Sequence, residues 1–281
     1  WNNKLHGGDV DEQLLDLGVC VIVKSTVWQM EYNGIQVDYK DEKMSVTHTR
    51  QTITYHTRHW NLREVRILEP GISWIREFMG MEAFSLQLAM NPGRLHCLER
   101  ALKADWKQRI STIQSSPARY AIIEGNTDPR VVGPQMFLEY YLPYIQEACQ
   151  QLHENKILAG AHLDSNNREL TLLFAETDLD LIESFIPPPD CDMSLTEARR
   201  AWPGKALQVH FPSSIHLYGE EKIRTFCESL VKEMENSKAI AIGVNEDVPD
   251  RGRRTLLPMY KYLEQFSQLQ SQGNHVKNHV I

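Results

Sequence analysis

The chain has 281 residues, of which 42% are hydrophobic and 24% are charged. This composition excludes a disordered or collagen-like chain and indicates a globular protein of one large or two small domains. Against 37 aspartates and glutamates stand 30 lysines and arginines, which gives a net charge of −7 without an evident basic patch. Because such a charge repels phosphate backbones, we expect no nucleic-acid partner.

No stretch of the sequence is apolar enough to suggest a membrane span. The longest apolar run, residues 239–244, is far shorter than the roughly 20 residues that cross a bilayer. The five cysteines are odd in number and widely spaced, with no CxxC pair. We therefore expect a soluble cytoplasmic protein whose cysteines pack as small hydrophobic residues. Cys191, which follows three prolines and an aspartate, is the one cysteine placed where chemistry could reach it.

The N-terminal region, residues 1–66, predicts an antiparallel β meander. Short β-rich runs are separated by turn residues, and Asn33-Gly34 lies between two alternating runs. Hairpin turns of type I′ need positive φ at both central residues, which asparagine and glycine tolerate. The expected strands cover residues 20–23, 27–32, 35–39 and 45–56.

After Pro70 the hydrophobic period becomes helical, which predicts helices over residues 73–90 and 92–115. From Arg119 onward, short apolar strands alternate with amphipathic helices. Ser194 and Glu197 form a capping box at the start of one of these helices. The five expected pairs of strand and helix are 120–123 with 134–154, 157–161 with 168–177, 181–185 with 195–202, 206–211 with 220–236, and 239–244 with 256–272.

This alternation predicts an α/β fold with a parallel sheet, either doubly wound or closed into a (β/α)8 TIM-type barrel. No glycine-rich phosphate loop follows a strand, which favours a barrel over residues 67–281. A barrel of eight units needs about 200 to 250 residues. Even with a sixth strand over residues 64–68 the count is short, so we suspect that a segment is absent near Arg66 and Ile67.

Polar side chains stand where the predicted strands end. The carboxyl ends of the strands of a barrel meet at one face, so residues distant in sequence converge there. Ionisable groups at the ends of apolar strands cost desolvation free energy unless they pair or bind something. Each such residue alone could be merely hydrogen-bonded, but together they predict a functional site. They are Glu124, Asn126, His162, Asp164, Glu183, His210, Asn245 and Glu246.

Several motifs carry a resemblance to a known superfamily. The most specific is residues 134–143, and the others are residues 54–57, 61–64 and 78–82, Asn91-Pro92 and the His162 loop. Residues 119–266 resemble the C-terminal part of the uroporphyrinogen decarboxylase superfamily. Residues 54–57 with 61–64 look like the hairpin entry of its corrinoid-dependent methyltransferase branch, to which the chain is most similar, and the other motifs support this resemblance. Residues 1–19 contain no counterpart of the arginine motif with which true decarboxylases hold their substrate, which disfavours porphyrinogen decarboxylation.

The resemblance implies a metal site with an altered set of ligands. The branch binds zinc through a His-x-Cys pair at one strand end and a cysteine at the last, where the metal lowers the pKa of a substrate thiol. Here the pair reads His162-Leu163-Asp164, and alignment on Val248-Pro249 puts Glu246 in place of the last cysteine. The implied ligands are thus His162, Asp164 and Glu246. Carboxylates in place of thiolates still suit Zn²⁺, but they shift the preference toward harder ions and leave the metal more Lewis acidic.

The activity implied by the resemblance is that of a corrinoid-dependent methyltransferase. It would move a methyl group from a small O- or N-methylated substrate to a corrinoid held by a partner protein. The metal, or His162 and Asp164 as a general acid, would polarise the leaving group. Glu183 and His210, counted with the catalytic residues, would support the catalytic groups or orient the substrate. The remaining strand-end residues, Glu124, Asn126 and Asn245, would bind the substrate.

Three alternatives to this interpretation stay open at the level of the sequence. The site residues could form a hydrogen-bonded acid/base set without a metal. The same His162, Asp164 and Glu246 could serve a metal-assisted decarboxylase or lyase acting on a small carboxylate. The third alternative is a barrel that binds a ligand without catalysis. A homodimer is compatible with the resemblance as well.

Overall fold

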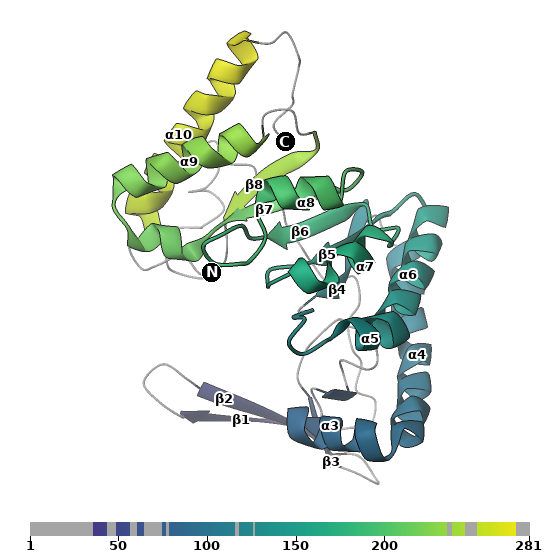
Figure 1. The fold of residues 1–281 in the computed structure, drawn as a ribbon. Coiled ribbons are helices and arrows are strands. Elements are labelled where there is room, and N and C mark those ends of the chain that lie inside the picture. The colour runs from purple at the N-terminus through teal and green to yellow at the C-terminus, as the bar shows by residue number, and fades with distance from the viewer. Residues whose placement is uncertain are drawn as a thin grey trace. The chain divides into compact units, whose positions relative to one another are not determined.

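The computed structural model describes residues 36–43, 49–56, 61–64, 75–76, 79–115, 118–125, 127–234, 238–244 and 252–273. They belong to two compact units, one within Thr26–Ala118 and the other within Arg119–Ile281 (Figure 1). The domain boundary and the absent segment expected near residues 66–67 fall among residues 65–74, outside the described part. Both stay predictions.

The first unit contains a small antiparallel sheet. Its strands, in spatial order, are β1 (Gln36–Lys43), β2 (Thr49–His56) and β3 (Asn61–Glu64). Ile53 lies opposite Glu64 in the register of β2 and β3. Glu64 therefore ends an antiparallel strand and does not begin the sixth parallel strand that was considered over residues 64–68. The hairpin expected at Asn33-Gly34 and the strands before it lie outside the described residues.

Two helices follow in the same unit, α3 (Met81–Met90) and α4 (Pro92–Gln114). Proline at the start of α4 suits the first helical turn, whose N–H groups have no partner within the helix. The sequence predicted one helix from residue 73. Instead, Gly80 has a φ of 77°, a left-handed conformation that separates the helical residues Ile75 and Arg76 from α3.

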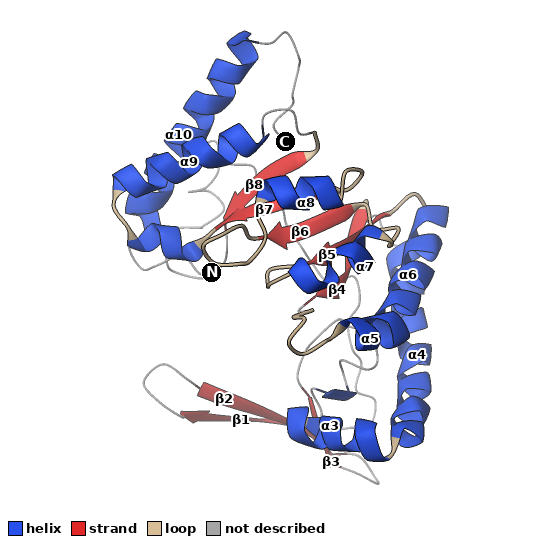
Figure 2. Cartoon of the chain, in the orientation of Figure 1, coloured by secondary structure: helices blue, strands red, loops and turns tan. Residues whose placement is uncertain are grey.

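The second unit is built on a parallel five-stranded sheet, as the alternating pattern predicted (Figure 2). The observed strand bounds differ from the predicted ones by at most two residues, and those of β6 and β7 agree with them. In spatial and chain order the strands are β4 (Tyr120–Gly125), β5 (Leu158–His162), β6 (Leu181–Phe185), β7 (Ala206–Phe211) and β8 (Ile240–Val244).

Helical segments connect these strands. The helix expected over residues 134–154 contains a π-helical turn, η1 (Phe137–Tyr141). This turn ends two residues before Pro143, which cannot donate the backbone hydrogen bond of a regular helix. The capping box of Ser194 and Glu197 at the start of α8 is confirmed. The segments are α5 (Pro134–Met136), η1 (Phe137–Tyr141), α6 (Leu142–Glu154), η2 (Arg168–Leu170), α7 (Thr171–Ala175), α8 (Leu195–Ala201), η3 (Ser213–Leu217), α9 (Glu220–Met234) and α10 (Gly252–Gly273).

The strand order carries information about the architecture. In a doubly wound sheet the order reverses at a switch point, where ligands bind. The order β4-β5-β6-β7-β8 has no reversal, and parallel crossovers are right-handed in nearly all proteins. Consecutive strands of a (β/α)8 barrel have this order. Because five described strands do not close a barrel, the closed barrel stays a prediction.

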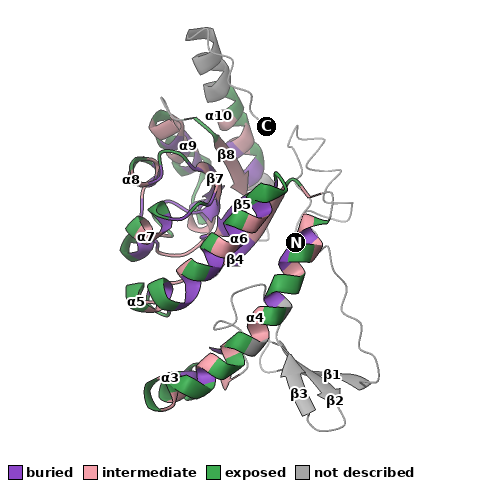
Figure 3. Cartoon of the chain, turned by 90° about the vertical axis from the view of Figure 1, so that its right-hand side faces the viewer, coloured by how far each residue is buried: buried purple, intermediate pink, exposed green. Residues whose placement is uncertain are grey.

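Apolar residues fill the inside of this unit, and Figure 3 colours the buried residues purple. Ala159, Ala161, Ile182 and Val209 are fully buried, as expected for strands of a parallel sheet. A cluster formed by β7, η3, α9 and α10 contains Phe211, Ile215, Ile223, Cys227, Leu256 and Met259. It fixes the last two helices next to the carboxyl end of β7.

Two of the cysteines behave as predicted. Cys149 and Cys227 are buried, and burial raises the pKa of each thiol to about 12. Cys97 is exposed, so the prediction is wrong for that residue. Among the helices of the described residues, none is both long and apolar enough to cross a membrane.

We expect Gly160→Ala to destabilise the second unit by about 1–3 kcal/mol, because overpacking a filled core has a cost of that order. The added Cβ would lie 2.9 Å from Cδ1 of Ile122 and 3.2 Å from the carbonyl oxygen of Leu181. Urea unfolding followed by circular dichroism measures the change. Gly204→Ala, where the added carbon meets nothing within 4 Å, is the matched control. Equal stability of the two variants would contradict the prediction.

Candidate active site

His162 lies between two carboxylates at the carboxyl edge of the parallel sheet. It is the last residue of β5, and Glu183 is its neighbour in register on β6. Nδ1 of His162 lies 2.5 Å from Oε2 of Glu183, and Nε2 lies 3.2 Å from Oδ2 of Asp164. The Glu183 side chain is only 1% exposed, whereas those of His162 and Asp164 are 24% and 30% exposed. One imidazole thus joins a buried carboxylate to an accessible one.

This pairing changes the charge of the imidazole. Burial lowers the pKa of His162, but hydrogen bonds to Asp164 and Glu183 and the charges of both carboxylates outweigh burial and raise the pKa to about 10. His162 is then an imidazolium at neutral pH, with an N–H directed at each carboxylate. The group can hold a proton at Nε2 close to solvent, as a general acid must.

A distorted segment of β6 brings a second histidine into the network. The register between β6 and β7 shifts between Ile182 and Phe185, and Ser184 has a φ of 61°. Oγ of Ser184 lies 2.8 Å from Nδ1 of His210, and Oε1 of Glu183 lies 4.0 Å from Nε2 of the same ring. Glu183 and Ser184, which would face opposite sides of a regular strand, therefore both face histidines.

The ring of His210 depends on a glycine of the next strand. Gly243 is its neighbour in register on β8. A Cβ at Gly243 would lie 2.8 Å from Cδ2 and 3.0 Å from Nε2 of His210. Only a residue without a side chain leaves the imidazole this position between β6 and β8.

The other predicted site residues divide into those the structure describes and those it does not. Glu124 is buried near the carboxyl end of β4, and its Oε1 accepts a hydrogen bond of 2.6 Å from Thr127. The residue after it, Gly125, is the register neighbour of His162. Asn126, Asn245 and Glu246 lie outside the described residues. The structure therefore brings together His162, Asp164, Glu183 and His210, with Glu124 on the neighbouring strand, and leaves their roles as predictions.

Cys191 lies beside the site, and its side chain is a protonated thiol, which is the unreactive form of cysteine. Its Sγ donates to the carbonyl oxygen of Asp164 over 3.3 Å. Burial raises the pKa of the thiol to about 11, with further contributions from the carboxylates of Asp164, Asp190 and Asp192. Since the thiolate is the nucleophile and the metal ligand, the thiol form argues against the reactive role considered for this residue.

The described part of the predicted ligand set fits a metal ion in its donor types and spacing. Any two ligand atoms of a tetrahedral zinc ion lie about 3.3 Å apart, given bonds of roughly 2.0–2.2 Å. Nε2 of His162 and Oδ2 of Asp164 are 3.2 Å apart. Glu183 accepts from the other ring nitrogen, as carboxylates commonly do behind a metal-binding histidine. Among the described residues no group of three metal-binding side chains occurs, and the third predicted ligand, Glu246, lies outside them.

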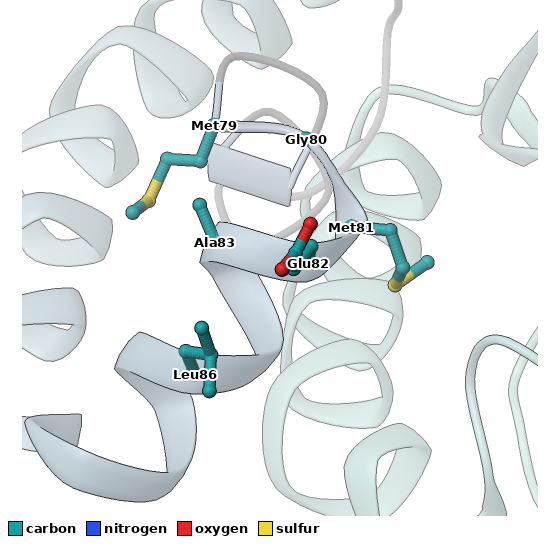
Figure 4. A pocket seen from close by; sticks show the side chains of 6 residues that line it. All are labelled: Met79, Gly80, Met81, Glu82, Ala83 and Leu86. Carbon is teal, nitrogen blue, oxygen red and sulfur yellow. The ribbon is translucent and has the colours of Figure 1, made fainter.

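A surface pocket lies elsewhere, at the start of α3 in the first unit (Figure 4). None of the predicted site residues contributes to it. Its lining comes from one short segment and is mostly apolar: Met79, Gly80, Met81, Glu82, Ala83 and Leu86. We therefore place the candidate chemistry at the histidine network and not in this pocket.

Comparison of the sequence with protein-family models and with curated proteins finds no match. Comparison of the fold finds a solved structure of a methyltransferase from Methanosarcina mazei, with a TM-score of 0.54 and 11% sequence identity. The similarity covers 71% of this chain and 57% of that chain, so this chain spans little more than half the length of its structural neighbour. At this identity the similarity shows a shared fold, and membership of the uroporphyrinogen decarboxylase superfamily stays a prediction.

In the presence of a chelator, we expect the free energy of unfolding to fall as the pH rises from about 6.5 to 10. The folded pKa of His162 is about 10, above the unfolded value of roughly 6.5, so its stabilisation is complete below pH 6.5 and is lost toward pH 10. One proton gives a slope of at most about 1.4 kcal/mol per pH unit. Urea unfolding at a series of pH values measures the slope.

The control for this measurement is a second histidine paired with a carboxylate in the same unit. His153, on α6, lies 2.7 Å from Asp180, which precedes β6 at the opposite edge of the sheet. The variant His162→Gln should lose the slope, and His153→Gln should keep it. A wild-type curve as flat as that of His162→Gln between pH 7 and pH 9 would show that the carboxylates do not hold a proton on His162.

Proposed function

We propose that the protein is a methyltransferase of the uroporphyrinogen decarboxylase type, built on a (β/α)8 barrel. It would take a methyl group from a small O- or N-methylated substrate and pass it to a corrinoid on a partner protein. The observation that carries the proposal is the imidazole of His162 held between Asp164 and Glu183 at a strand end. The sequential parallel sheet and the fold shared with a methyltransferase support it.

The chemistry asked of these residues is activation of a leaving group. Demethylation of an ether or an amine leaves an oxygen or nitrogen with excess negative charge, which must be protonated or bound as the methyl group departs. The proton on Nε2 of His162 lies next to Asp164, the more exposed of the two carboxylates. Glu183 holds the imidazole from behind and balances its charge. His162 would thus protonate the heteroatom, and Asp164 would orient that proton.

A divalent metal would be held by His162, Asp164 and Glu246 in the same place. Such an ion supplies a Lewis acid that polarises the leaving group without proton transfer. His162 would offer its Nε2 lone pair to a metal only after it loses the proton that the two carboxylates favour. We therefore infer that metal affinity rises with pH through the neutral range.

We expect His162→Gln and Asp164→Asn to lower the rate of methyl transfer by about 100-fold or more, since general acid catalysis contributes roughly 10²–10⁴-fold. The assay mixes the protein with cob(I)alamin and a panel of methoxylated aromatics and methylated amines, and follows methylcobalamin by its absorbance. The variant His153→Gln is the control, since it changes a paired histidine at the other edge of the sheet and should leave the rate unchanged. Methyl transfer that is equally fast in all of these proteins would refute the assigned roles.

Elemental analysis of the purified protein separates the metal-dependent version from the acid/base version. Near-stoichiometric zinc that is lost in both Asp164→Ala and Glu246→Ala supports the metal ligands we propose. Methyl transfer by a wild-type protein that carries no metal, and that a chelator does not inhibit, supports His162 as the acid alone. Release of CO2 from small carboxylates without a corrinoid would instead favour the decarboxylase alternative.

A further inference from the structure

We propose that Ser184 is a positioning residue that holds His210 in a single tautomer, with the proton on Nε2 and the lone pair on Nδ1. The inference deepens the proposed function, on which the role of His210 rests. It assigns a task to a residue that no sequence motif marked. Three independent features of the structure point to it.

The first feature is a backbone conformation that serine rarely adopts. Ser184 has a φ of 61° inside β6, where a regular strand would have an extended backbone. The left-handed region is unfavourable for residues other than glycine, and such conformations cluster at functional sites. A glycine would remove this cost, so the presence of a serine indicates that its hydroxyl has a use.

The second feature is what the hydroxyl contacts. The Ser184 side chain is fully buried, and its Oγ lies 2.8 Å from Nδ1 of His210. Among the described residues, the contact with His210 is the hydrogen bond that the Ser184 hydroxyl makes. In a regular strand, Ser184 would face the side of the sheet opposite to Glu183. The register shift beside Ser184 instead lets its side chain reach a residue of β7.

The third feature is the other side of the imidazole. Nε2 of His210 lies 4.0 Å from Oε1 of Glu183, and a carboxylate can only accept. A proton on Nε2 is therefore favoured, which leaves Nδ1 as an acceptor for the Ser184 O–H. Gly243 leaves the ring room to adopt this orientation. Because Glu183 also binds His162, the tautomer of His210 determines whether the shared carboxylate faces an N–H or a lone pair.

The experiment is ¹⁵N NMR of the imidazole nitrogens in protein labelled at histidine. In the wild type, the His210 signals should be those of the Nε2–H tautomer. The buried hydroxyl could accept from Nδ1–H only by leaving its own O–H without the His210 acceptor, so it favours the Nε2–H tautomer. In Ser184→Gly and in Ser184→Ala, we therefore expect the tautomer ratio to shift about fivefold toward Nδ1–H, which corresponds to one lost hydrogen bond of average strength. Ser184→Ala keeps the backbone strain and Ser184→Gly removes it, so a shift common to both belongs to the hydroxyl.

The matched control is Ala239→Gly. Ala239 is another residue with positive φ, 54°, and it directly precedes β8. Its replacement relieves the same kind of strain without touching the site, so the His210 signals should not change. We expect both glycine variants to unfold at the same or a higher urea concentration than the wild type. Unchanged ring signals in the folded Ser184 variants would overturn the proposal, whatever the methyl-transfer assay shows.

The activity readout is kept apart from the tautomer readout. In the methyl-transfer assay, Ser184→Gly should lower kcat about tenfold with little change in KM, because the hydroxyl positions His210 and does not touch the substrate. A changed tautomer in a protein without methyl-transfer activity would leave the positioning role in place and refute the proposed function. A changed tautomer with unchanged kcat would limit Ser184 to a structural role and overturn the link to catalysis.

Discussion

The site depends on one buried carboxylate. Glu183 is almost completely removed from solvent, and an isolated charge in such a place costs several kcal/mol of desolvation free energy. Its two oxygens lie near two imidazoles, at 2.5 Å from His162 and 4.0 Å from His210. The proton held on His162 offsets the charge of Glu183. Asp164 helps to keep this proton on His162, so it lowers the free-energy cost of burying the Glu183 carboxylate.

The backbone of β6 is what allows one strand to serve both neighbours. A regular strand would direct Glu183 and Ser184 to opposite faces of the sheet, so one of them would miss the histidines. The left-handed φ of Ser184 and the register shift beside it remove that restriction. On the far side of β7, Gly243 of β8 leaves the space that the His210 imidazole needs. The strained backbone of β6 is thus accompanied by free space beside β8.

The sequence predicts much of the second unit because its strands are short apolar runs between recognisable helices. Such runs identify β6 and β7 to the residue, and the parallel arrangement brings polar residues at the strand ends to one edge. The role of Ser184 could not be predicted in this way, because it depends on a single φ angle that contradicts the alternation of a strand. The break at Gly80 escaped for a similar reason, since a helical period continues across a glycine unless its conformation is known. The features that the sequence predicts follow from the hydrophobic pattern, and the features that it misses depend on the local backbone conformation.

Under the proposed function, Asp164 stands where the family has a cysteine, and the geometry gives this difference a physical meaning. A cysteine at position 164 would be mostly an uncharged thiol at neutral pH and would do little to keep a proton on His162, whereas a carboxylate is charged. Asp164 is a strong acceptor 3.2 Å from Nε2 and supports a bound proton. In the proposed function it would also hold a metal ion, so the same side chains would offer either a proton or a metal to the leaving group. Which of them would act depends on the free energy of removing the proton from His162, and that free energy depends on the hydrogen bonds that Asp164 and Glu183 accept from the imidazole.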